Sequence, residues 1–196
     1  MSEPIIENVM VYGFGWSMIA AKYPMCTETH PYRKSIGADY DLATRLGNAP
    51  IGSGHDCYLK GIIAQFDLTF SRQAWLEALR YHFFDIVSSE STMHMLPKMK
   101  CSFTPDTDER VIKAFTEVLE EYKTTPSEDN WKKIIYSYPV GLQLTARVTT
   151  NYLQLKTMYN QRKNHRLPEW KEFCQTLLDD EKFPDFVKLC LGGNNK

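Results

Sequence analysis

Basic and amide side chains that could contact a polar or anionic ligand lie near the C-terminal end of the sequence. Arg147 and Asn151 are four positions apart. On a helix, such a pair lies about 40° apart around the axis, so both could face one ligand. Lys156 follows nine positions after Arg147, about half a turn around the same helix. This spacing predicts that Lys156 serves the site of a second subunit, or no site.

The same region carries a basic cluster that could hold phosphates. Its members are Lys156, Arg162, Lys163, His165 and Arg166. Lysine acts as a point charge, whereas arginine offers a bidentate fork, so the two are not interchangeable where a base is recognised. The alternative is a solvated basic helix end that complements the helix dipole.

A serine-rich loop is the second candidate site. Ser88, Ser89 and Ser91 offer hydroxyl and backbone donors that suit a phosphate. Glu90 could accept a hydrogen bond from a base or a ribose. Serine-rich loops also form for backbone reasons alone, and an exposed glutamate is equally consistent with the sequence.

Two further histidines, His82 and His55, are candidate site residues. His82 could orient or protonate a ligand, or it could be a core residue beside Phe83. His55 and Cys57 are two candidate metal ligands, but no second pair completes a zinc site, so we predict no metal site. The sequence contains no G-x-S-x-G, P-loop or G-x-G-x-x-G motif, and therefore predicts neither a classical nucleophile nor a Rossmann-type nucleotide site.

Hydrophobic periodicity predicts the elements that must position these groups. Strands are expected over Asn8–Phe14, Ile62–Phe70 and Gly141–Thr149, with Asp85–His94 as strand or loop. Helices are expected over Ser17–Tyr23, Ala38–Leu46, Ser71–Asp85, Asp106–Lys123, Pro126–Tyr136, Thr150–Arg162, Pro168–Leu178 and Phe183–Leu191. Irregular segments are expected over Cys26–Ile36 and Gly47–Gly54. This order predicts an α+β or mixed α/β fold rather than a β-α-β repeat.

The segment from Thr145 to Trp170 resembles a motif of the flavin-dependent thymidylate synthases, also called thymidylate synthase complementing proteins. In that family a strand ends in an arginine, a helix reads N-x-L-x-L-R, and a histidine and a tryptophan follow. The matching residues here, in the same order, are Arg147, Asn151, Leu153, Leu155, Lys156, His165 and Trp170. Lys156 stands where the family has its last arginine, and a short insertion precedes His165.

Two weaker similarities precede this motif in family order. Ser53–Cys57 resembles the start of the family's G-H-x-x-P-x-E-H segment, and Ser91 lies near the position of its phosphate-binding serine. The family's R-H-R signature is replaced by Arg80-Tyr81-His82, and no arginine closes the loop after Ser91. The sequence thus resembles a divergent member of the family.

The resemblance implies a central, mostly antiparallel sheet flanked by helices, without a Rossmann motif. It implies FAD as cofactor, contacted by Arg147, Asn151, His165, His82 and His55. It also implies a pyrimidine deoxynucleotide such as dUMP, contacted by Ser91, Glu90, Ser89 and Arg80, with Lys156 at the catalytic position. Reduced folate and NADPH would be co-substrates: reduced flavin would pass a one-carbon unit from folate to the base, then a hydride. Family members assemble their sites from neighbouring subunits, so a homo-oligomer, a tetramer by resemblance, is expected.

Composition limits the other classes of function. The chain has 196 residues, 43% hydrophobic and 24% charged, with a net charge of -1, which predicts one soluble domain over residues 1–196 with a frayed tail at 192–196. The near-neutral charge gives no argument for DNA, RNA or an anionic membrane. We expect no signal peptide and no membrane span. The five scattered cysteines favour reduced thiols and a cytoplasmic location.

Two functional hypotheses follow. The first is a divergent flavin-dependent thymidylate synthase-like enzyme that acts on a pyrimidine deoxynucleotide. The alternative is a non-catalytic descendant that keeps the fold and binds a nucleotide or a partner, for example in a phage or mobile element. The broken R-H-R signature and the missing loop arginine favour this alternative. An unrelated α/β protein would be the third case.

Overall fold

An antiparallel sheet forms the centre of the protein. The structure is a computed structural model that describes residues 5–27, 37–50 and 52–192. Within these ranges the strands are β1 (Ile6–Tyr12), β2 (Ile63–Ser71), β3 (Asp85–Ser89) and β4 (Gln143–Asn151). They are arranged in the order β1-β2-β4-β3, and each neighbouring pair is antiparallel. The expected α+β fold with a mostly antiparallel sheet is confirmed.

The two faces of the sheet differ in polarity because side chains alternate along each strand. On β2 and β4 one face is buried, through Ala64, Phe66, Leu68, Phe70, Leu144, Ala146 and Val148. The opposite face is polar and half-buried, through Gln65, Asp67, Thr69, Thr145, Arg147 and Thr149. The hydrophobic core therefore lies on one side of the sheet.

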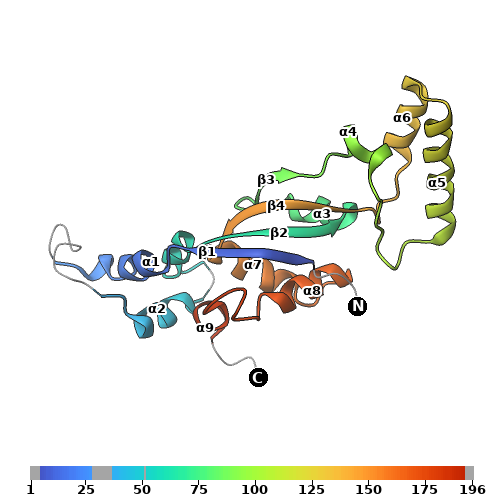
Figure 1. The fold of residues 1–196 in the computed structure, drawn as a ribbon. Coiled ribbons are helices and arrows are strands. Elements are labelled where there is room, and N and C mark those ends of the chain that lie inside the picture. The colour runs from blue at the N-terminus through green and yellow to red at the C-terminus, as the bar shows by residue number, and fades with distance from the viewer. Residues whose placement is uncertain (1–4, 28–36, 51, 193–196) are drawn as a thin grey trace.

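Helices cover the apolar face of the sheet. Figure 1 shows α7 (Tyr152–Arg162), α8 (Pro168–Thr176) and α9 (Phe186–Cys190) on one side of the strands. The ring of Trp170 on α8 lies 4.9 Å from that of Phe70. The ring of Phe66 lies 5.6 Å from that of Phe183. Aromatic packing of this kind attaches the C-terminal helices to β2.

The remaining elements lie around this core and at the two ends of the molecule. Helices α1 (Phe14–Ala20) and α2 (Tyr40–Gly47) lie near one end, and α3 (Arg72–Ala78) directly follows β2. The other end carries α4 (Thr92–Met95) and the hairpin of α5 (Glu109–Thr124) and α6 (Glu128–Ser137), as Figure 1 shows. Short 3₁₀ turns span Tyr23–Met25, Cys57–Gly61 and Leu96–Lys98. No helix in the described ranges is both long and apolar enough to cross a bilayer.

Two helix caps that the sequence predicts are present in the structure. The Ser71 hydroxyl accepts a hydrogen bond from the Ala74 amide at the start of α3. The Ser127 hydroxyl accepts one from the Asn130 amide at the start of α6. Both serines satisfy backbone N–H groups that the first helical turn leaves free.

The predicted helix over Ser71–Asp85 is wrong in its second half. Helix α3 ends at Ala78, and turns lead to β3. The chain must leave the helix here because Phe84 is buried, with its ring 6.2 Å from that of Phe66, and because β3 pairs with β4. The segment left open as strand or loop forms β3 and then α4.

The predicted helix start at Thr150 is also wrong, because strand pairing continues further. Ile63 of β2 pairs with Asn151 of β4, so α7 begins only at Tyr152. The final helix is shorter than predicted and spans Phe186–Cys190. Most of the segment predicted to be irregular at 26–36, and the tail from 193 onward, lie outside the described residues.

Candidate functional site

A cavity of about 250 Å³ lies between α3 and the end of β3 and is here called the α3–β3 cavity. Its volume is close to the lower end of small-molecule sites. Ser89, Glu90 and Ser91 line it, together with Arg72 and Trp75. The structure therefore brings three of the predicted nucleotide-contacting residues to one cavity.

Glu90 continues the hydrogen bonding between β3 and β4 by one residue beyond the end of β3. Its backbone N–H donates to the Thr145 carbonyl at 3.0 Å, and its carboxylate Oε2 accepts from the Thr145 N–H at 2.7 Å. The register between these strands shifts between Ile86 and Ser88, as a β-bulge does when it redirects the following side chains. Glu90 is thus held by the sheet, and one carboxylate oxygen remains without a protein partner among the described residues.

The two serines occupy different local structures. Ser89 pairs with Ala146 as the last residue of β3. The Ser91 hydroxyl accepts a hydrogen bond from the His94 amide at 3.3 Å and caps α4. A capping hydroxyl still carries a proton that it can donate to a ligand.

Helix α3 supplies the opposite wall. The Trp75 indole Nε1 donates to the Leu144 carbonyl at 2.9 Å, which fixes the ring against β4. Arg72 is the one basic residue among those lining this cavity, and in the described part of the chain no carboxylate lies within 4 Å of its guanidinium. Its charge is available to an anion.

Sequence reasoning missed Arg72 and Trp75 as candidate site residues. Arg72, Trp75 and Leu79 recur at helical i, i+3, i+7 spacing and all line the cavity. That spacing was the signal, but it could be interpreted only once the position of β3 beside α3 was known. Arg80, which we expected near the nucleotide, is exposed in the turn after α3 and does not line the cavity.

Arg147 lies on the polar face of the sheet. It belongs to β4, so the helical geometry by which we related it to Asn151 and Lys156 is wrong. Its guanidinium donates to the Asp67 carboxylate at 3.2 Å and to the Asn8 carbonyl at 2.8 Å. A hydrogen bond from Asn8, and then Arg147, hold the pKa of Asp67 below its usual value, against an opposing contribution from burial.

Asn151 and His165 lie at opposite ends of α7. The Asn151 side chain accepts a hydrogen bond from the Gln154 amide at 2.9 Å and caps the helix. His165 Nε2 lies 3.2 Å from Glu77 Oε2, which also contacts Arg162 at 2.6 Å. These contacts join α3 to the segment between α7 and α8.

The other two histidines that we expected at the flavin, His82 and His55, are exposed. His82 lies in the turn after α3, with its ring 4.6 Å from that of Phe83. His55 lies in the loop before the Cys57–Gly61 turn. In the described residues, no group of three or more His, Cys, Asp or Glu side chains is arranged to hold a metal ion.

Lys156 is buried on α7. Its ammonium lies 2.7 Å from Asp56 Oδ2 and 2.7 Å from the Gly47 carbonyl oxygen. Both side chains of the ion pair are about 5% exposed. In a single chain, Lys156 thus ties α7 to the loop before the Cys57–Gly61 turn.

The residues expected at the flavin lie at separate places in the described part of the chain. Arg147 lies on the sheet face, Asn151 and His165 at the two ends of α7, and His82 and His55 in exposed loops.

Comparison with known proteins defines the fold. No protein-family model and no curated protein matches this sequence. The structure is similar to that of the flavin-dependent thymidylate synthase ThyX from Helicobacter pylori complexed with FAD and dUMP, with a TM-score of 0.64 and 19% identity over 93% of this chain and 96% of that one. A second structure of thymidylate synthase X from Helicobacter pylori with FAD and dUMP gives a TM-score of 0.65 and 18% identity over 98% of each chain. The chain therefore has the fold of flavin-dependent thymidylate synthases.

Proposed function

We propose that the protein is a divergent flavin-dependent thymidylate synthase-like enzyme that binds a pyrimidine deoxynucleotide such as dUMP. The observation that carries the proposal is the α3–β3 cavity, where Ser89, Glu90 and Ser91 meet Arg72, which has no carboxylate partner among the described residues. The fold is shared with proteins solved with FAD and dUMP. Arg72 and the serine hydroxyls would bind the phosphate. Glu90 would accept a hydrogen bond from the ribose or the base.

FAD is the proposed cofactor, with reduced folate and NADPH as co-substrates. When bound, the flavin would supply the reducing equivalents. The protein would hold it between copies of the chain in a homo-oligomer, through Arg147, Asn151 and His165 and the exposed His82 and His55. The tetrameric state and the cytoplasmic location stay predictions.

The visible spectrum of the purified full-length protein, before and after addition of FAD, tests the cofactor. We expect the absorbance bands of oxidised flavin to remain with the protein after gel filtration. We also expect dUMP to raise the melting temperature, because a ligand at 100 times its Kd stabilises by about 2.7 kcal/mol. A protein that retains no flavin and does not respond to dUMP would overturn the proposal.

Arg72→Gln tests the nucleotide site. Loss of a charged hydrogen bond, worth about 1.5–3 kcal/mol, should weaken dUMP binding by at least about tenfold. Arg110→Gln is the matched control, because its side chain is 90% exposed on the distant hairpin. Equal dUMP affinity in the two variants would remove Arg72 from the site.

A non-catalytic nucleotide-binding protein is the second candidate. It is favoured by Lys156, whose ammonium is engaged by Asp56 and backbone carbonyls instead of being free for a base. Flavin and dUMP binding without any conversion of dUMP in the presence of reduced folate and NADPH would support it. Formation of thymidylate would exclude it.

A further inference from the structure

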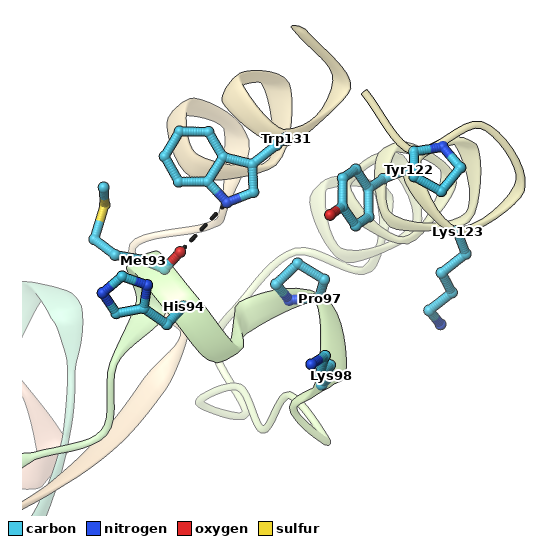
Figure 2. A pocket seen from close by; sticks show the side chains of 8 residues that line it. Met93, His94, Pro97, Lys98, Tyr122, Lys123 and Trp131 are labelled. Atoms are coloured by element: carbon cyan, nitrogen blue, oxygen red, sulfur yellow. Dashed lines mark hydrogen bonds between the residues drawn. The ribbon is translucent and has the colours of Figure 1, made fainter. Parts of the chain in front are cut away.

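A second cavity, of about 490 Å³, lies between the α4 segment and the hairpin of α5 and α6. We call it the hairpin cavity. Its volume falls within the range of small-molecule sites, about 300–1,000 Å³. Figure 2 shows Met93, His94 and Trp131 on one side of it, Tyr122 and Lys123 on the other, and Pro97 and Lys98 between them. Only Met93 also lines the α3–β3 cavity.

Aromatic and apolar side chains form part of the walls of the hairpin cavity. The indole Nε1 of Trp131 donates to the Met93 carbonyl at 3.3 Å, which joins α6 to α4 and orients the ring (Figure 2). Tyr122 on α5 and Pro97 in the Leu96–Lys98 turn supply further flat surfaces. Such surfaces favour a planar ring, because aromatic contacts add to the energy of apolar burial.

The charge of the cavity is positive. Lys98 and Lys123 line it, and no carboxylate does so in the described residues. Lys123 is paired with Glu120 at 2.7 Å. Lys98 has no carboxylate within 4 Å in the parts of the chain that the structure describes, so its ammonium is free to pair with an anion.

We propose that the hairpin cavity binds a small anion that carries a planar ring. The ring packs against Trp131 and Tyr122, and the negatively charged group pairs with Lys98. This assignment is independent of the nucleotide site proposed above, because the charged and aromatic residues of the two cavities are different.

Fluorescence titration of the full chain with 1-anilinonaphthalene-8-sulfonate tests this assignment, since the probe combines aromatic rings with one negative group. N-phenyl-1-naphthylamine has the same rings without the sulfonate. Lys98→Gln should weaken binding of the sulfonate by about tenfold and leave binding of the neutral probe unchanged. Lys113→Gln, an exposed lysine on α5 outside the cavity, should change neither. Equal sulfonate affinity in the two lysine variants would overturn the proposal.

Energy transfer from tryptophan to the bound probe gives its position without relying on affinity. Trp131→Phe keeps an aromatic wall and should lower the transfer, although Trp75 at the adjoining cavity continues to contribute. Trp16→Phe removes a tryptophan that is 70% exposed on α1 and should leave the transfer intact. Unchanged transfer in Trp131→Phe would place the probe elsewhere. Displacement of the probe by dUMP would assign this cavity to the nucleotide site and overturn its independence.

Discussion

Lys156 and Asp56 form a buried ion pair, with 2.7 Å between Nζ and Oδ2. The Gly47 and Ala49 carbonyl oxygens accept further hydrogen bonds from the same ammonium. The pair connects α7 to a loop about one hundred positions earlier in the chain. A residue that the motif places at the nucleotide therefore also has a structural role inside the single chain.

Removing one partner of this pair should destabilise the protein strongly. Lys156→Met leaves the Asp56 charge buried without a counter-ion, which costs about 3–5 kcal/mol of unfolding free energy. Urea denaturation followed by circular dichroism measures the loss. Lys132→Met is the control, because its pair with Glu128 is exposed and worth less than about 1 kcal/mol. Similar stability of the two variants would show that the buried pair does not hold the loop.

The Asp67 carboxylate, which accepts a hydrogen bond from Asn8 and pairs with Arg147, should make stability depend on pH in the acid range. Because the pKa of Asp67 is lowered in the folded state, its contribution is complete above its unfolded pKa, about 4. The contribution is lost as pH falls through the lower folded value. Both side chains are more than a quarter exposed, so the effect is at most on the order of 1 kcal/mol. Urea midpoints of Asp67→Asn should therefore fall less between pH 5 and pH 2 (roughly the titration range) than those of the unchanged protein. Parallel falls of the two midpoints would contradict the lowered pKa of Asp67 in the folded protein.

Two neighbouring glycines should respond oppositely to alanine. Gly13 has φ of +87°, and a Cβ there would collide with the Gly61 carbonyl oxygen, so Gly13→Ala should cost about 1–3 kcal/mol. A Cβ on Gly15, in helix α1, would meet open space. Gly15→Ala should therefore stabilise the protein by about 0.5–1 kcal/mol. The midpoint of thermal unfolding, measured for each variant and for the unchanged protein, checks this prediction. If both substitutions shift the midpoint in the same direction, the turn geometry at Gly13 is contradicted.

The cysteines should fall into two reactivity classes. Burial raises the pKa of the Cys174 thiol to about 12 and also raises that of Cys190, whereas Cys57 is exposed. Since the thiolate is the reactive form, a disulfide reagent at pH 8 should label Cys57 rapidly and spare Cys174 and Cys190 until the protein is denatured. Peptide mapping by mass spectrometry identifies the labelled sites. Rapid labelling of Cys190 in the native protein would contradict the packing of α9.

Much of the secondary structure could be predicted from local patterns. Alternation in Ile62–Phe70 and Gly141–Thr149 identified β2 and β4, and helical spacing identified α5 and α6. The boundaries failed where distant contacts decide them. Pairing with β2 extends β4 to Asn151, and the burial of Phe84 ends α3 at Ala78.

The residues of the candidate site were likewise only partly predictable from the sequence. Ser89, Glu90 and Ser91 could be chosen from the sequence because they are adjacent hydroxyl and carboxylate groups in one loop. Arg72 could not, because nothing local places the first turn of α3 beside that loop. The sheet does so, through the pairing of β3 with β4 and the contact of Trp75 with Leu144.

The sequence by itself determined the fold class and, through the ordered motif from Arg147 to Trp170, the resemblance to flavin-dependent thymidylate synthases. Periodicity and residue order are local properties of the chain, and they suffice for these conclusions. Only the tertiary structure decided which charges are free. Lys156 and Arg147 have carboxylate partners 100 and 80 positions away along the chain, whereas Arg72 and Lys98 have none among the described residues. Pairing over such separations is a consequence of packing, which no local pattern reports.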